Sequence, residues 1–185
     1  MPPLRKLILP AAVLGCIVWY QNRPHPDALD GLWKRITLPY HVLRLTLQPP
    51  DEVLPMPVEG VRAALVANTW HAARTEGRRH EGQDIFAPRG APVYSATRGV
   101  VIRVGENRLG GKSVSVLGSG GRSYYYAHLE RYAGRIGRGD KVDANTVLGY
   151  VGTSGNAAGT PPHLHFGIYT SQGPIDPLPL LVDRL

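Results

Sequence analysis

Short apolar runs separated by glycine-rich turns dominate the chain from residue 58 onward. Valine, isoleucine, tyrosine and threonine recur in these runs, and such residues favour strands. The turns read GENRLGGK, GSGGR and GTSGNAAG, and they are rich in residues that tolerate a positive φ angle or form local side-chain hydrogen bonds. We therefore expect a mainly β fold. The expected strands cover residues 92–96, 99–104, 113–117, 123–129, 147–151 and 163–169.

Proline and polar residues dominate the part of the chain before this pattern. We expect a linker over residues 21–56 and a compact domain over residues 57–185. Apolar residues alternate over residues 41–48, which predicts one strand that docks on the domain. A short helix over residues 28–34 is an equal alternative within the linker.

The first twenty residues have the pattern of an export signal. Arg5 and Lys6 precede an uncharged, largely apolar run over residues 7–20. This run is shorter than the roughly 20 residues that a spanning helix usually needs, so an uncleaved anchor and a cleaved signal peptide both stay open. The residues that lead to Cys16 also resemble a lipobox, but Cys16 is better explained as a small apolar residue of the segment.

The basic residues at the N-terminus predict that everything after residue 20 lies outside the inner membrane, because positive charge stays on the cytoplasmic side. We expect a cell-envelope protein that is held at the inner membrane, with its domain on the periplasmic side. Cys16 is the single cysteine, so the domain has neither a disulfide nor a cysteine-ligated metal.

Length and charge narrow the function classes. The chain has 185 residues, 43% of them apolar, which suffices for one packed domain. Its net charge of +7 attracts polyanions, but the predicted export argues against nucleic acid as a partner. The basic residues are scattered, so anionic cell-wall polymer, lipid headgroups or solubility alone account for the charge.

Two histidine motifs provide the candidate chemistry. His163 and His165 alternate in the run TPPHLHFGIY, and alternate residues of a strand project from the same face. Upstream, HEGQD places His80 and Asp84 four residues apart. Gly82 between them lets the backbone bend, so that the two side chains converge from a loop and the start of a strand.

Catalytic zinc is usually held by three side chains of the His, Asp and Glu type, with a fourth position open for water. His80, Asp84 and one member of the His163–His165 pair would supply that set for one zinc ion per chain. The remaining histidine of the pair and His128, from the sequence YAH, are then available for proton transfer.

The chain also resembles a known family in several separated motifs. The motifs are HEGQDIFAPRGAPVYSATRGVV, YYYAHL, GDKVDANTVLGYVGTSGNAAGTPPHLHFGIY and the closing IDP. Over residues 57–185 they resemble the lysostaphin-type, or LytM-domain, zinc endopeptidases of peptidoglycan. The resemblance implies a sandwich of the duplicated-hybrid-motif type with an antiparallel sheet that forms a groove. Gln83 and the three tyrosines before Ala127 are slight departures from the family pattern.

The same resemblance assigns roles to individual residues. It implies that His80, Asp84 and His165 bind zinc, and that His128 and His163 form the catalytic pair. Asn156, in the turn before HLH, is a further candidate for binding the substrate.

The sequence therefore predicts a zinc-dependent endopeptidase that hydrolyses amide bonds in the stem peptides or crosslinks of peptidoglycan. The main alternative is a non-enzymatic LytM-like protein that activates a cell-wall amidase; such proteins typically lack part of the metal set. A second alternative is a metal-dependent protein that binds wall polymer without cleaving it.

Overall fold

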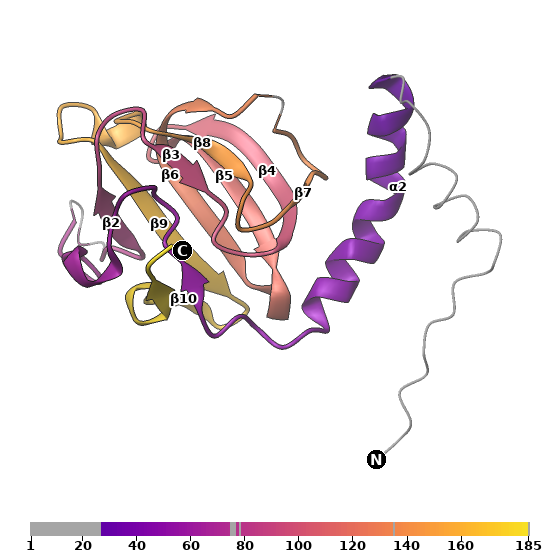
Figure 1. The fold of residues 1–185 in the computed structure, drawn as a ribbon, viewed down its shortest axis with the longest axis horizontal. Helices are drawn as coiled ribbons and strands as arrows, with labels where there is room; N and C mark the ends of the chain where they lie inside the picture. The colour runs from indigo at the N-terminus through magenta and orange to yellow at the C-terminus, as the bar shows by residue number, and fades with distance from the viewer. Residues whose placement is uncertain (1–26, 75–76, 78, 135, 185) are drawn as a thin grey trace, which may run out of the picture. The chain divides into compact units, whose positions relative to one another are not determined.

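The computed structural model describes residues 27–74, 77, 79–134 and 136–184 (Figure 1). The expected export signal and Cys16 lie outside these residues and stay predictions. Among the helices of the described part of the chain, none is long and apolar enough to cross a membrane. The chain divides into two compact units, Met1–Lys34 and Arg35–Leu185, and all strands of the described residues lie in the second unit.

A 20-residue helix, α2 (Asp27–Thr46), replaces most of the expected linker. The strand predicted over residues 41–48 is wrong, and the helix is longer than the alternative over residues 28–34. Leu38, Val42 and Leu45 follow one another at spacings of four and three residues, and all three are partly buried. Leu43, Leu45 and Leu47 alternate as in a strand, so this segment fits a strand period as well as a helical one, and the helix includes Pro39.

The second unit is built on a nine-stranded antiparallel sheet. Its main path follows the order β10-β9-β6-β5-β4-β7, while β2 pairs with β9, and β8 pairs with both β3 and β6. Figure 1 shows β2 and β9 at one side of this sheet. The strands are β2 (Gln83–Phe86), β3 (Pro92–Tyr94), β4 (Gly99–Asn107), β5 (Gly111–Gly118), β6 (Ser123–Tyr132), β7 (Lys141–Val142), β8 (Val147–Val151), β9 (His163–Thr170) and β10 (Gly173–Ile175).

The mainly β prediction is confirmed. Each of the six expected strands overlaps an observed one, namely β3, β4, β5, β6, β8 or β9. The strands that the pattern did not predict are mostly two or three residues long, which is too short for an alternation to be recognised. Short 3-10 turns complete the described fold at Ala63–Leu65, Ser119–Gly121, Gly155–Ala157 and Leu178–Leu180.

The folded domain begins earlier than residue 57. A small parallel pair joins β1 (Leu54–Pro55) to β11 (Leu181–Val182), so the two ends of the domain meet. Leu54 and Met56 are fully buried in the hydrophobic core. Further upstream, the backbone carbonyl of Asp51 accepts a hydrogen bond from Arg122 at 2.7 Å. The last residues of the expected linker therefore belong to the domain.

Replacing Leu54 by alanine tests this boundary. Leu54→Ala removes a fully buried side chain, and we expect it to lower the free energy of unfolding by about 2–5 kcal/mol. Val53→Ala is the matched control, because Val53 is 60% exposed and should change stability by less than about 0.5 kcal/mol. Urea unfolding measures both, and equal midpoints for Leu54→Ala and the parent would place this segment outside the core.

Candidate active site

The pairing of β2 with β9 places the two sequence motifs opposite each other. In this antiparallel register Asp84 lies directly across from His165, and Phe86 lies across from His163. Directly opposite residues project from the same face of a sheet. On the other side of β9, Ala127 of β6 pairs with His165. The register therefore brings HEGQD and HLH to one face. His128 follows Ala127 and lines the same groove as these motifs, with a left-handed backbone that departs from the regular strand.

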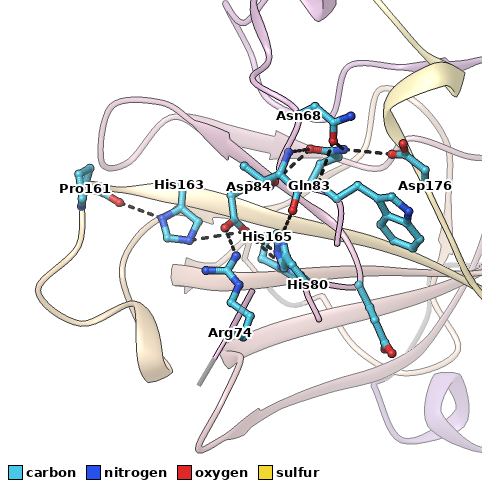
Figure 2. Close-up of polar contacts among 12 residues, drawn as sticks. Asn68, Arg74, His80, Gln83, Asp84, Pro161, His163, His165 and Asp176 are labelled. Carbon is cyan, nitrogen blue, oxygen red and sulfur yellow. Dashed lines mark hydrogen bonds and ion pairs between the residues drawn. The ribbon is translucent and has the colours of Figure 1, made fainter. Parts of the chain in front are cut away.

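His80, Asp84 and His165 converge there on one point (Figure 2). The Nε2 atom of His80 lies 2.8 Å from Nδ1 of His165 and 3.0 Å from Oδ1 of Asp84. The third side of the triangle, from His165 Nδ1 to Asp84 Oδ1, measures 3.2 Å. His80 and Asp84 are buried, and His165 is nearly so. The structure thus brings together the three residues predicted as metal ligands.

Two residues that sequence reasoning missed hold this cluster. The backbone carbonyl of Thr69 accepts a hydrogen bond from Nδ1 of His80 at 2.8 Å, which leaves Nε2 of His80 to face the cluster. Thr69 also accepts a hydrogen bond from the backbone N–H of Asp84 through its hydroxyl oxygen. Arg74 forms an ion pair with Oδ2 of Asp84, so Oδ1 is the oxygen that faces the two histidines. Thr69 and Arg74 lie in irregular sequence, where no pattern marks them.

The electrostatics of the cluster favour a charged Asp84 and a neutral His165. Burial by itself would raise the pKa of Asp84, but hydrogen bonds with His165, His80 and Arg74 together hold that pKa well below its usual range. Burial lowers the pKa of His165, against the opposing effect of Asp84. A neutral imidazole and an ionised carboxylate are the protonation states that bind a metal.

The donor set fits a zinc ion. Zinc accepts histidine nitrogen and carboxylate oxygen at about 2.0–2.2 Å, and tetrahedral ligands at that distance lie about 3.3–3.6 Å apart. The three atoms here are separated by 2.8–3.2 Å, so a small outward shift suffices. Three protein ligands leave a fourth position of a tetrahedron open, as in catalytic rather than structural zinc sites.

His128 and His163 lie beside this cluster, and each ring donates a hydrogen bond from Nδ1 to a backbone carbonyl. Nδ1 of His128 donates to the carbonyl of Ser154 at 2.9 Å, and Nδ1 of His163 donates to that of Pro161 at 2.8 Å. The two rings meet edge to face with their centroids 5.1 Å apart. In its neutral form each ring therefore keeps Nε2 as the unprotonated nitrogen, and Nε2 of His163 lies 3.9 Å from Oδ1 of Asp84.

His128 has two unusual properties. Its φ angle is +62°, a left-handed conformation that is uncommon for residues other than glycine. Burial lowers its pKa to about 4, with a smaller contribution from the neighbouring His165 and His163. The ring is therefore neutral at physiological pH.

A groove of about 760 Å³ runs over the five residues of the site. Arg74, Arg79, Asn107 and Asn156 also line it. Asn156 is exposed, and its backbone N–H donates to the carbonyl of Leu109 at 2.9 Å, so its side chain is available to the groove. Its role in binding a substrate stays a prediction.

A glycine is required at position 82 because a side chain would not fit there, and not because the backbone bends. Its φ angle is not in the left-handed region, in contrast to the expectation that a bend requires glycine here. A Cβ atom at this position would lie 2.6 Å from Cε1 of His165 and 2.8 Å from the carbonyl oxygen of Phe166. The ring of His165 can pack against the HEGQD segment only because residue 82 has no side chain.

Adding one methyl group at this position tests the packing. Gly82→Ala should displace the ring of His165 and weaken zinc binding by roughly 10- to 100-fold, the range typical for losing a group that orients a ligand. Gly105→Ala is the matched control, because a Cβ at Gly105 meets open space. Zinc titration against a chromogenic chelator measures both, and parent-like affinity of Gly82→Ala would show that the ring does not need this gap.

Comparison with known proteins places the site in context. The chain is 42% identical over 125 residues to the L-Ala–D-Glu endopeptidase of Bacillus subtilis, a match over 62% of this chain and 38% of the relative. It is 31% identical over 96 residues to the peptidoglycan DD-endopeptidase ShyC of Vibrio cholerae, a match over 52% of this chain and 21% of the relative. The chain therefore spans less than two fifths of the length of these curated relatives.

Solved structures agree with this similarity. The catalytic domain of the antimicrobial peptidase lysostaphin from Staphylococcus simulans superimposes with a TM-score of 0.54 at 27% identity, over 61% of this chain and 88% of that one. A zinc-containing peptidase from Vibrio cholerae gives a TM-score of 0.57 at 26% identity, over 69% of this chain and 40% of that one. The sequence model of Peptidase family M23 matches residues 78–177, which include all five residues of the site, and the chain belongs to that family.

Proposed function

We propose that this protein is a zinc-dependent endopeptidase that cleaves amide bonds in the peptide part of peptidoglycan. The observation that carries the proposal is the meeting of His80, Asp84 and His165 within hydrogen-bond distance of one another, beside two further histidines. The family match and the endopeptidase relatives support hydrolysis, and the similarity to a zinc-containing peptidase supports the choice of metal.

The five residues of the site form two groups with different tasks. His80, Asp84 and His165 would hold the zinc, which supplies a Lewis acid that polarises the scissile carbonyl and acidifies water. His163 and His128 present unprotonated Nε2 atoms beside that point, so one accepts the proton of the attacking water and delivers it to the leaving amine. The other donates or accepts a hydrogen bond at the reacting centre. Their carbonyl partners, on Ser154 and Pro161, hold both rings in the required tautomer.

The groove suits an extended peptide, and the sheet beneath it keeps the catalytic groups fixed. The relatives named above differ in the bond that their names specify, since one acts on L-Ala–D-Glu and the other on a DD bond. We propose a stem peptide or crosslink as the substrate class. Mass spectrometry of the fragments released from defined muropeptides identifies the bond.

Substitutions should separate metal binding from proton transfer. We expect His80→Ala, Asp84→Ala and His165→Ala to lose zinc and peptidoglycan hydrolysis together, because each removes one of three ligands. His163→Ala and His128→Asn should keep zinc while kcat falls by about 10²- to 10⁴-fold. Asparagine is chosen at position 128 because it tolerates the left-handed backbone there. Zinc per chain and release of new amine ends are measured on the same samples.

Two results would contradict the proposal. A parent protein that contains zinc and binds peptidoglycan without releasing amine ends would indicate a binding protein. A parent protein without hydrolysis that increases the activity of an added cell-wall amidase would indicate the activator. Unchanged kcat for both His163→Ala and His128→Asn would refute their catalytic role even if hydrolysis by the parent is confirmed.

We further propose that the domain acts outside the inner membrane and is held close to it. The apolar run over residues 7–20 behind Arg5 and Lys6 supports export. The part of helix α2 in the second unit adds an exposed apolar stripe of Ile36, Tyr40 and Leu43, at spacings of four and three residues, that suits contact with lipid.

Alkaline phosphatase fused to the C-terminus of the full chain tests this location. The fusion should be active, because this enzyme folds to its active form only after export. The protein should also sediment with membranes. An inactive fusion in the soluble fraction would contradict both export and membrane association.

A further inference from the structure

Gln83 is a buried amide at a place where the fold provides an apolar environment. It alternates with Asp84 along β2, so the two side chains project from opposite faces. Gln83 lies across from Phe166, on the core-facing side that it shares with Ile85, and it is fully buried. Burial of an amide is costly unless its hydrogen bonds are made. An apolar residue would be the simpler choice for packing alone.

Every hydrogen-bonding position of this amide is used (Figure 2). Oε1 accepts from the backbone N–H of Thr69 at 2.9 Å and from its hydroxyl at 3.0 Å. Nε2 donates to Oδ1 of Asn68 at 3.1 Å and to Oδ1 of Asp176 at 3.0 Å. Two acceptor and two donor positions are the full capacity of a glutamine side chain. Gln83 therefore joins the segment before the HEGQD motif to the segment after β10.

Thr69 connects this amide to two of the candidate ligands. Its hydroxyl has a single hydrogen, which goes to Gln83, so its oxygen is oriented to accept from the N–H of Asp84 at 2.9 Å. Its carbonyl accepts from Nδ1 of His80 at 2.8 Å. One residue thus fixes the backbone at Asp84 and the tautomer of His80, and both of its own donors are held by Gln83.

We propose that Gln83 is a positioning residue that acts through Thr69 on the metal ligands His80 and Asp84. The inference rests on the proposed zinc site and adds a second layer to it. Without the amide, the Thr69 hydroxyl is free to rotate and its backbone N–H loses its partner, so the carbonyl that orients His80 is no longer anchored. Loss of such an outer partner typically weakens metal binding about 10- to 100-fold.

Zinc affinity of the metal-free chain, titrated with Zn²⁺ against a chromogenic chelator, tests the proposal without reference to activity. Gln83→Met keeps the approximate volume and removes all four hydrogen bonds, and Thr69→Val removes only the hydroxyl. We expect each variant to weaken zinc binding by about 10- to 100-fold. Thr69→Ser, which retains the hydroxyl, should bind zinc nearly as well as the parent protein.

A double substitution shows whether the two residues act in series. If Gln83 works through Thr69, the effects of Gln83→Met and Thr69→Val should not add. The zinc affinity of the double variant should then be within about twofold of that of the single variant that binds zinc more weakly. The visible absorption of the cobalt-substituted protein gives a second readout, and it should change in Gln83→Met because the ligand geometry changes. Ser95→Ala is the control for a buried polar group, since its hydroxyl donates to the carbonyl of Thr97.

The outcomes distinguish this proposal from the proposed function. A parent chain that fails to bind zinc refutes the zinc site itself. The positioning role alone is overturned if the parent binds zinc and both Gln83→Met and Thr69→Val bind it with an affinity within twofold of the parent. In that case a fall in urea-unfolding midpoint like that of Ser95→Ala would assign the network to stability alone. If Gln83→Met does not fold, Thr69→Val and Thr69→Ser still decide the question.

Discussion

The antiparallel register between β2 and β9 is the constraint on which the site depends. It sets Asp84 directly opposite His165, although the two residues are 81 positions apart in the chain. A shift of one residue would turn Asp84 towards the core and Gln83 towards the groove, because the side-chain period of a strand is two. The apolar residues Ile85, Leu164 and Phe166 on the opposite face oppose that shift, since it would expose them. The hydrophobic core thus fixes the geometry of a polar site.

Backbone carbonyl groups complete what the register begins. Each of His80, His128 and His163 donates a hydrogen bond from Nδ1 to a carbonyl, so each keeps Nε2 for the site. Such bonds select the tautomer without adding charge next to a cation. Arg74 is the exception, since it binds the second oxygen of Asp84 from a partly exposed position on the groove wall. Backbone groups therefore hold most of the site in place, and the ion pair of Arg74 with Asp84 is the contact that an approaching substrate can reach.

Much of this arrangement could be predicted from the sequence, for identifiable reasons. The strands that carry HLH and YAH have clear alternation, and the motifs HEGQD and HLH indicate which residues converge. The sequence predicts at most a short part of helix α2, over residues 28–34, because residues 41–48 fit both periods. The start of the domain lies before the predicted residue 57, because β1 is only two residues long. Thr69 and Arg74 carry no pattern, since their positions result from long-range packing. The reason why residue 82 is a glycine cannot be predicted from the sequence either, because the ring of His165 packs against this position only in the folded chain.

A crystal structure of the zinc-loaded protein, with anomalous diffraction recorded at the zinc absorption edge, tests the central claim most directly. We predict one anomalous peak per chain, about 2.0–2.2 Å from Nε2 of His80, Nδ1 of His165 and Oδ1 of Asp84. Solvent should complete the coordination, with His128 and His163 outside bonding distance of the metal. A peak coordinated by other residues, or no peak between these three side chains at saturating zinc, would contradict it.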